Sequence, residues 1–202
     1  MSTSRPAPVV PLRPPPPLEE RDDDALMALA ASEYRPAFEM LAGRYLHRLV
    51  SYCAKFLGDT SAGEEVAQDV LLEAWRQRAR YEGRGRLRVL LFTIARHRCG
   101  NRARDDGRRR RLPCLDGGEP VVGNPDSGEE LDHLLESERR RRVREALTSL
   151  PVKLREAVLL RFDQGLRYAE IARIVHRPEV TVRSRVFNAL RRLRGELGED
   201  PP

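Results

Sequence analysis

Apolar side chains recur at steps of three and four residues through most of this chain, and nowhere do they alternate with period two for long enough to form a strand. Such spacing places them on one face of an α-helix. The clearest run lies between residues 24 and 57 and comprises Phe38, Leu41, Tyr45, Leu49, Tyr52 and Phe56. The pattern returns at about 61–75, 87–103 and 131–150. The sequence therefore predicts an all-α fold.

Proline and glycine divide the helical pattern into two blocks. Seven of the 15 prolines fall within residues 1–17, and seven prolines and glycines fall within residues 112–132. Segments of this composition cannot continue a helix and tend to be extended or disordered. We therefore expect a disordered Pro-rich tail, a helical domain, a flexible acidic linker, a second helical domain and a short tail, at 1–24, 25–111, 112–132, 133–196 and 197–202.

Charge is distributed unevenly along the chain. The 202 residues carry a formal net charge of +6, which resolves into −3 over 1–33, +9 over 34–115, −8 over 116–138 and +8 over 139–202. Of the 37 basic side chains 35 are arginine, whose guanidinium binds phosphate through two parallel hydrogen bonds and keeps its charge. The two basic blocks indicate either contact with a polyanion such as nucleic acid or a solvated helical surface.

Several function classes find no support in the sequence. No apolar run approaches the roughly 18 residues of a membrane span, and the start lacks an apolar signal core, so we expect no membrane insertion and a cytoplasmic protein. Three widely spaced cysteines argue against a disulfide framework: Cys53, Cys99 and Cys114. A lone His97-Arg98-Cys99 on an apolar helix is more often structural than metal-binding. No glycine-rich phosphate loop follows a strand, and we expect no metal, no cofactor and no catalytic residues.

Residues 168–187 fit a helix-turn-helix. Ile171, Val175 and Val182 supply a small core between two short helices, and His176 occupies the turn, where glycine is usual. The second helix, from about Glu179, can enter the major groove of DNA. It presents Thr181, Arg183, Ser184, Arg185, Phe187 and Asn188. An ordinary helical hairpin remains the alternative at this point.

Two stretches together resemble a known family. LTSLPVKLREAVLLRFDQGLRYAEIARIVHRPEVTVRSRVFNALRRLR, residues 147–194, resembles domain 4 of sigma-70-family sigma factors of the extracytoplasmic-function (ECF) group. GDTSAGEEVAQDVLLEAW…FTIARHR, residues 58–98, resembles domain 2 of the same group. The resemblance implies a transcription initiation factor that binds core RNA polymerase, directs it to promoters with −35 and −10 elements, and assists melting. It implies no enzyme, because nucleotide transfer belongs to the polymerase.

The resemblance also assigns residues of the first domain. A helix opened by a capping box of Ser61 and Glu64 corresponds to the segment that grips the β′ coiled coil of the polymerase. Its expected polymerase-binding residues are Glu65, Gln68, Asp69, Leu72 and Trp75. The following loop and helix correspond to the part that flips a base of the −10 element into a pocket. The expected −10 residues are Tyr81, Arg84, Arg86, Arg88, Arg96 and Arg98. The family often has tryptophan at Leu90, and asparagine and aspartate at His97 and Asn101.

In the second domain the resemblance places contacts to the −35 element on the helix-turn-helix. The expected residues are Arg161, Thr181, Arg183, Ser184, Arg185, Phe187 and Asn188. The family more often has a basic residue at Asn188, and glycine at His176 and Val180. Members of the group contact the β and β′ subunits and are often held inactive by an anti-sigma factor, so the resemblance allows such a partner here.

Two other classes fit parts of the sequence. A stand-alone helix-turn-helix regulator would use residues 34–105 for sensing or dimerisation, but it has no use for Glu65, Gln68 and Asp69. An adaptor that only holds other proteins is disfavoured by the basic balance of both helical blocks. The resemblance also implies a path for the acidic linker, because linkers of this family run through the polymerase, where an acidic segment can mimic nucleic acid in a basic channel.

Overall fold

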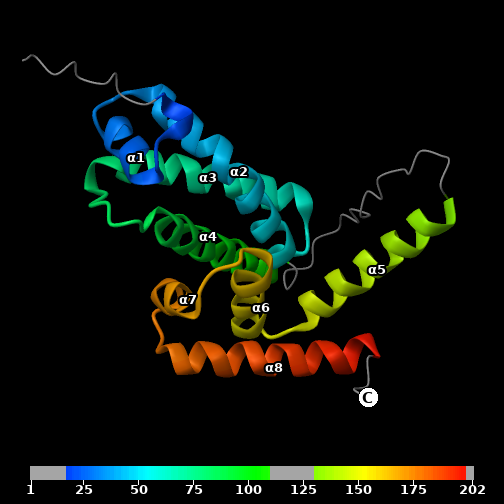
Figure 1. Ribbon diagram of the computed structural model, residues 1–202. Coiled ribbons are helices and arrows are strands. Elements are labelled where there is room, and N and C mark those ends of the chain that lie inside the picture. Colours follow the sequence, from blue (N-terminus) through cyan, green and yellow to red (C-terminus); the bar gives the residue numbers. More distant parts are fainter. Residues whose placement is uncertain (1–16, 110–129, 199–202) are drawn as a thin grey trace, which may run out of the picture.

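The computed structural model describes residues 17–109 and 130–198, and within these ranges the chain forms helices and no strand, which confirms the all-α fold (Figure 1). The first domain contains η1 (Leu18–Glu20), α1 (Asp23–Ala31), α2 (Arg35–Leu57), α3 (Thr60–Gln77), η2 (Arg78–Arg80) and α4 (Leu87–Arg109). The second domain contains α5 (Glu130–Ser149), α6 (Val152–Val158), the π-helical turn η3 (Leu159–Asp163), α7 (Tyr168–Val175) and α8 (Glu179–Leu197).

The central helix of the first domain is α2, which packs against α1, α3 and α4. Five of its six predicted apolar residues are buried, and Phe38 is partly buried. The ring of Tyr52 contacts the rings of Phe56 and Phe92, at centroid distances of 5.9 and 5.5 Å. Helix α3 crosses α2 at Gly63, where a Cβ atom would lie 2.5 Å from the backbone nitrogen of Ala54. Only glycine allows this approach.

The N-terminal boundary differs from the sequence expectation. A disordered tail was expected as far as residue 24, but residues 18–20 form η1 and α1 begins at Asp23. The carboxylate of Asp22 caps α1 by accepting a hydrogen bond from the Ala25 amide at 2.7 Å. The acidic run in this segment is therefore a helix start, where carboxylates satisfy free backbone N–H groups and favour the helix dipole.

Two helix starts also differ. The run from 24 to 57 is two helices, because the chain turns at residues 32–34, where Glu33 has a φ of 65°, and Pro36 then occupies the first turn of α2. Helix α3 is capped by Asp59, whose carboxylate accepts from the Ala62 amide at 2.8 Å, and not by the expected capping box of Ser61 and Glu64.

The second domain begins at Glu130, three residues before its expected start. The rest of the predicted acidic linker, 112–129, lies outside the described residues.

Helices α7 and α8 form the predicted helix-turn-helix. Ile171, Val175 and Val182 are buried between them. His176 ends α7 in the left-handed conformation, with φ 50° and ψ 51°. The next amide, of Arg177, donates to the Ala172 carbonyl at 3.0 Å. The turn that usually takes glycine is thus made here by histidine.

The two domains pack against one another (Figure 1). Helices α2 and α4 of the first domain face α6, η3 and α7 of the second, and the start of α6 also approaches the end of α2. We call this contact the seam. Helix α8 lies on the far side of α6 and α7 from the first domain (Figure 1). The C-terminal end of α5 contacts α2 and α8, and its N-terminal part projects away from the rest of the molecule (Figure 1).

Candidate polymerase-binding and DNA-binding surfaces

Helix α3 presents one polar stripe to solvent. Its buried side carries Val66, Ala67, Val70 and Ala74. On the opposite side Glu65, Gln68, Asp69 and Leu72 are all exposed, and Leu72 has 53% of its surface accessible. Arg102 of α4 donates to Glu65 at 3.0 Å. The structure thus brings four of the five predicted polymerase-binding side chains onto one face.

Trp75, the fifth, has a different environment. Its ring meets Phe38 edge to face, with centroids 5.1 Å apart, and the Arg78 guanidinium lies 3.8 Å from the ring centroid. Arg78 in turn donates to the Ala30 carbonyl at 3.1 Å. Trp75 is half-buried and connects α3 to α1 and α2. In this structure its contacts are internal.

A cleft of about 510 Å³ lies beside the loop between η2 and α4. Tyr81, Arg84 and Arg86, three of the predicted −10 residues, line it. Its other lining residues are Gln77, Arg80, Glu82, Gly83, Val89, Leu90 and Thr93, with Arg173 and His176 from the second domain. Arginines, a tyrosine and an apolar wall suit an unstacked base with its phosphates.

The other three predicted −10 arginines do not join this cleft. Arg88 donates to the Gln164 carbonyl of the second domain at 2.9 Å. Arg96 pairs with Glu156 of α6. Arg98 pairs with Glu73 of α3 at 3.2 Å. Two of these arginines therefore belong to the seam and one stabilises the first domain.

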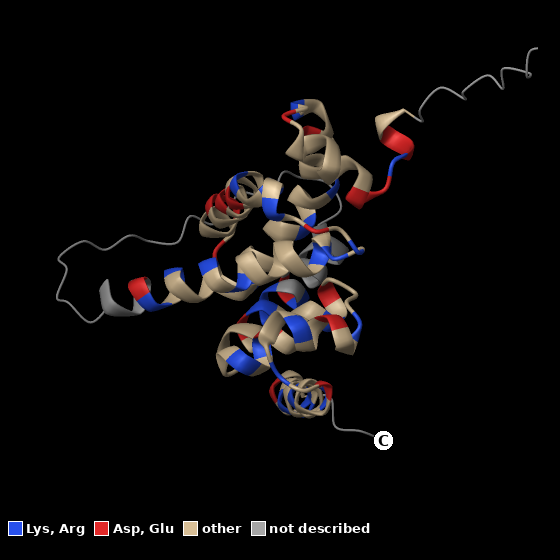
Figure 2. Ribbon diagram, turned by 90° about the vertical axis from the view of Figure 1, so that its left-hand side faces the viewer, with Lys and Arg blue, Asp and Glu red and all other residues tan. Residues whose placement is uncertain are grey.

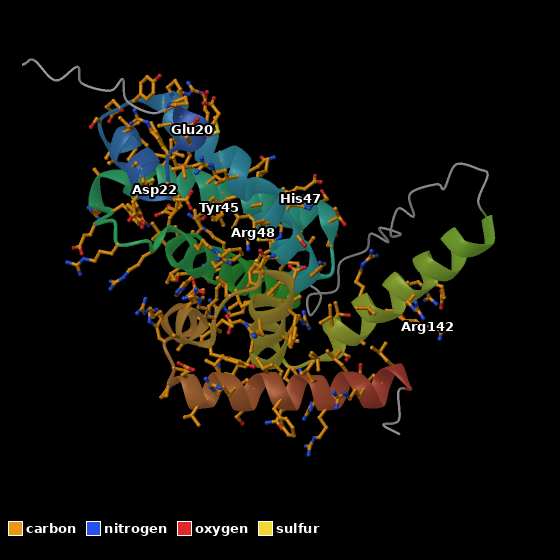
Figure 3. The ribbon with its side chains drawn as sticks, viewed as in Figure 1. Glu20, Asp22, Tyr45, His47, Arg48 and Arg142 are labelled. Carbon is orange, nitrogen blue, oxygen red and sulfur yellow. The ribbon has the colours of Figure 1, made fainter. Side chains whose placement is uncertain are left out.

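The seam holds the only two polar side chains that are buried in the described part of the chain, Glu156 and Gln164. Burial raises the pKa of Glu156, and the charge of Arg96 opposes this rise. The backbone carbonyl of Gln164 accepts a hydrogen bond from Arg48 at 2.6 Å and another from Arg88. The side-chain amide of Gln164 donates to the backbone carbonyl of Arg48 at 3.1 Å. Figure 3 labels Arg48 on α2.

A second group of polar contacts crosses the seam at Asp163. Its carboxylate pairs with Lys55 and accepts from the Ser51 hydroxyl at 3.2 Å. Nearby, Arg155 of α6 donates to the Phe56 carbonyl at the end of α2, at 2.6 Å. Backbone carbonyls, carboxylates and arginines therefore pair across the whole contact. Blue Lys and Arg segments occur in both domains (Figure 2).

The recognition helix α8 leaves its predicted DNA-contacting face open. Arg183, Ser184 and Phe187 are exposed, and Phe187 has 66% of its surface accessible. Arg183 pairs with Glu179 at 2.5 Å and lies 4.7 Å from the Tyr168 ring centroid. Thr181, Arg185 and Asn188 are partly buried, and the Asn188 amide donates to Ser184 at 3.5 Å.

Arg161, the remaining predicted −35 residue, lies in η3 and not on α8. It donates to the Leu166 carbonyl at 3.0 Å and stacks over Tyr168, 4.9 Å from the ring centroid. The sequence predicted the position of the second helix of the helix-turn-helix, which is α8, but it did not indicate Asp24, which binds Tyr81 and Gly85, or Glu156 and Gln164 of the seam. No local pattern could have indicated these three, because each acts through a partner far away in sequence.

The described residues contain no helix that is long and apolar enough to span a membrane. Within the same ranges, histidine, cysteine and acidic side chains do not gather in groups that could hold a metal ion. Cys53 and Cys99 are buried and adjacent, and each thiol is free. Contact with Cys53, together with burial, raises the pKa of Cys99 and so disfavours its reactive thiolate form.

Comparison with known proteins gives two family matches in chain order. Residues 41–109 match the model of sigma-70 region 2, and residues 140–193 match that of sigma-70 region 4. The ECF RNA polymerase sigma factor SigK of Mycobacterium tuberculosis is 30% identical over 183 residues, covering 90% of this chain and 97% of that protein. The RNA polymerase sigma-H factor of Pseudomonas aeruginosa is 28% identical over 181 residues, covering 85% and 92%.

Two solved structures share the fold. The sigma factor RpoE of Bartonella quintana, in complex with the anti-sigma factor NepR, is 27% identical, with a TM-score of 0.66 over 81% of this chain and 98% of that one. CnrH in complex with the cytosolic domain of CnrY is 22% identical, with a TM-score of 0.67 over 89% and 99%. With both family regions present in order and full-length relatives at this identity, the chain belongs to the ECF group of sigma-70-family RNA polymerase sigma factors.

Proposed function

We propose that this sigma factor binds core RNA polymerase mainly through α3, reads the −10 element with the cleft beside residues 81–86, and reads the −35 element with α8. The observation that carries this division of tasks is the exposed stripe on α3. A DNA-binding regulator without a polymerase partner has no need for carboxylates on such a surface. The protein is not an enzyme, because a sigma factor leaves nucleotide transfer to the polymerase.

The stripe on α3 suits a basic protein partner. Glu65 and Asp69 would repel DNA phosphates, whereas they attract a basic helix such as that of a coiled coil. Leu72, at the C-terminal end of the stripe, adds one apolar contact, and protein interfaces commonly combine an apolar centre with a polar rim. We therefore assign Glu65, Gln68, Asp69 and Leu72 to the β′ coiled coil, and Trp75 to supporting the end of α3.

The two DNA surfaces differ in kind. The cleft beside residues 81–86 is a concave site for an extruded base, with Arg84 and Arg86 available for the backbone phosphates. Helix α8 is a convex surface for duplex DNA, with Arg183 and Ser184 near its N-terminal end, as in other helix-turn-helix readers. Because one surface takes single-stranded and the other double-stranded DNA, the two domains divide promoter melting from promoter docking.

We infer that the seam opens before promoter melting. Arg88 and Arg96 are held by the second domain, and α7 supplies Arg173 and His176 to the wall of the cleft. The −35 surface on α8 is free in the same conformation. The closed chain is therefore ready to dock at −35 but not to wrap the −10 strand.

We infer that an anti-sigma factor could regulate this chain, since RpoE of this fold has been solved with the anti-sigma factor NepR and CnrH with the cytosolic domain of CnrY. We propose that a partner of this kind would stabilise the seam. We also place the protein in the cytoplasm, where the polymerase works.

The polymerase assignment is tested by a pull-down of core polymerase by the full chain. The parent chain is compared with the double variant Glu65→Ala/Gln68→Ala and with a control variant, Glu39→Ala, on the exposed face of α2. Loss only in the double variant supports the assignment, and equal binding by all three contradicts it.

A further inference from the structure

The loop before α4 has an unusual backbone. Three successive residues, Gly83, Arg84 and Gly85, have positive φ values of 78°, 72° and 64°. For arginine this conformation costs on the order of 1 kcal/mol or more, and it persists only where the surroundings hold it. The loop must therefore be fixed by contacts from outside itself.

Asp24 of α1 supplies these contacts. Its Oδ1 accepts a hydrogen bond from the Tyr81 hydroxyl at 2.6 Å, and its Oδ2 accepts one from the Gly85 amide at 2.7 Å. The Tyr81 oxygen in turn accepts from the Arg86 amide at 3.2 Å. These bonds, Tyr81 first and Gly85 second, lower the pKa of Asp24. One carboxylate thus spans both ends of the loop.

This arrangement decides what the loop can offer to DNA. The Tyr81 hydroxyl donates its proton to Asp24 and accepts from the Arg86 amide, so it has no further proton to donate to DNA, and we infer that its ring faces the base. Arg84 and Arg86 are exposed on the same short segment, and the fixed backbone sets where their side chains leave it. A loop that is ordered before the base arrives does not lose the entropy of its own ordering on binding.

We propose that Asp24 is a positioning residue for −10 recognition, which holds the 81–86 loop in the shape that captures the flipped base. The proposal rests on the assignment of this loop to the −10 element. Asp24 lies in α1, which precedes residues 41–109, the stretch that matches sigma-70 region 2. The loop is therefore held by a segment outside the part of the chain that matches this family region.

Asp23 provides a matched control. It is the neighbouring carboxylate in the same first turn of α1, and it too accepts from a tyrosine hydroxyl, that of Tyr45. It also pairs with Arg44 at 3.0 Å. Both partners of Asp23 lie on α2, so its removal loosens α1 without touching the loop. A change that appears with Asp24 and not with Asp23 is therefore specific to the loop.

The test uses holoenzyme assembled from core polymerase and the full chain. The variants are Asp24→Ala, Asp24→Asn and the control Asp23→Ala, together with Arg84→Ala and Arg86→Ala in the loop itself. The measurements are affinity for a fluorescent single-stranded −10 oligonucleotide, discrimination against single-base changes in it, and hydrogen exchange of residues 81–86. For Asp24→Ala we expect a tenfold or greater loss of affinity, reduced discrimination and faster exchange. For Asp24→Asn we expect a smaller loss, and for Asp23→Ala less than twofold. Holoenzyme formation should change less than twofold throughout.

Three outcomes overturn the proposal in distinguishable ways. If Arg84→Ala loses affinity and discrimination but Asp24→Ala does not, Asp24 has no positioning role, although the loop reads −10. If Arg84→Ala and Arg86→Ala both bind and discriminate as the parent chain does, the loop itself is not the −10 reader, and both assignments fail. Equal losses in Asp23→Ala and Asp24→Ala would show that only the packing of α1 matters, which also contradicts the proposal.

Discussion

Replacing Arg96 with alanine should open the seam in a pH-dependent way. Arg96 is the ion-pair partner of Glu156, whose side chain is only 4% exposed. Removal of one partner from a buried pair typically costs about 3–5 kcal/mol, because the remaining charge is left unpaired. Here the second domain can move away and hydrate the carboxylate, so we take about 3 kcal/mol, which changes the ratio of closed to open chain roughly 150-fold.

The direction of the pH effect follows from Glu156. Burial already raises its pKa in the closed chain, and without Arg96 the pKa rises further, while Arg185 of α8 still favours the charge. The other titratable groups coupled to Glu156 are Tyr52 and Cys99, whose pKa values lie above the working range. A group whose pKa is higher in the closed chain than in the open chain stabilises the closed chain at pH values below its ordinary pKa. This stabilisation is lost as the pH rises through the raised pKa. Arg96→Ala should therefore close near pH 5 and open near pH 8.

Fluorescence resonance energy transfer between dyes attached at the positions of Ala28 and Arg191 measures the distance between the domains. Cys114 is replaced by serine so that it takes no dye. Both labelling positions are exposed. Arg98→Ala is the control, because Arg98 lies on the same helix but pairs within the first domain. Adding Glu156→Gln to Arg96→Ala should restore closure at pH 8, since no buried charge remains. If Arg96→Ala stays closed at pH 8, or if Glu156→Gln does not rescue it, the reasoning about the seam is wrong.

Three further predictions concern single surfaces. Glu65→Ala with Gln68→Ala should weaken binding to core polymerase by about 1–3 kcal/mol in a titration, yet leave affinity for a −35 duplex unchanged. Gly63→Ala should lower the free energy of unfolding by about 3 kcal/mol in denaturant melts, because its Cβ would clash with the backbone of α2. Gly43→Ala, which has open space around it, should instead raise the free energy of unfolding by about 0.5–1 kcal/mol. Arg183→Ala should cost about 1–3 kcal/mol in binding to the −35 duplex and relax its specificity at one base pair, and a uniform loss across sequences would instead indicate a phosphate contact.

The periodic parts of this protein were predictable from sequence. The apolar stripe of α2, the start of α4 and the helix-turn-helix follow from three- and four-residue spacing, although α4 continues to Arg109, beyond its predicted end at about residue 103. His176 adopts the left-handed turn that its position required. The polar stripe on α3 was also visible, since Glu65, Gln68 and Leu72 alternate with buried alanine and valine.

What sequence could not provide is the pairing of polar residues across long separations. Asp24 reads as part of an acidic tail, and its contacts with Tyr81 and Gly85 cross 57 and 61 residues. Glu156 reads as a surface residue of an amphipathic helix until the first domain covers it. For the same reason Arg88 and Arg96 seemed to be free DNA contacts, whereas the fold gives them partners in the second domain.

Transcription with purified core polymerase tests the central claim most directly. The full chain and core polymerase are mixed with genomic fragments, and run-off transcripts are mapped. The account predicts discrete start sites that share −35 and −10 elements, appear only when the chain is added, and disappear with Glu65→Ala and Gln68→Ala. Failure to form a holoenzyme, under conditions where another sigma factor does so with the same core polymerase, would contradict it.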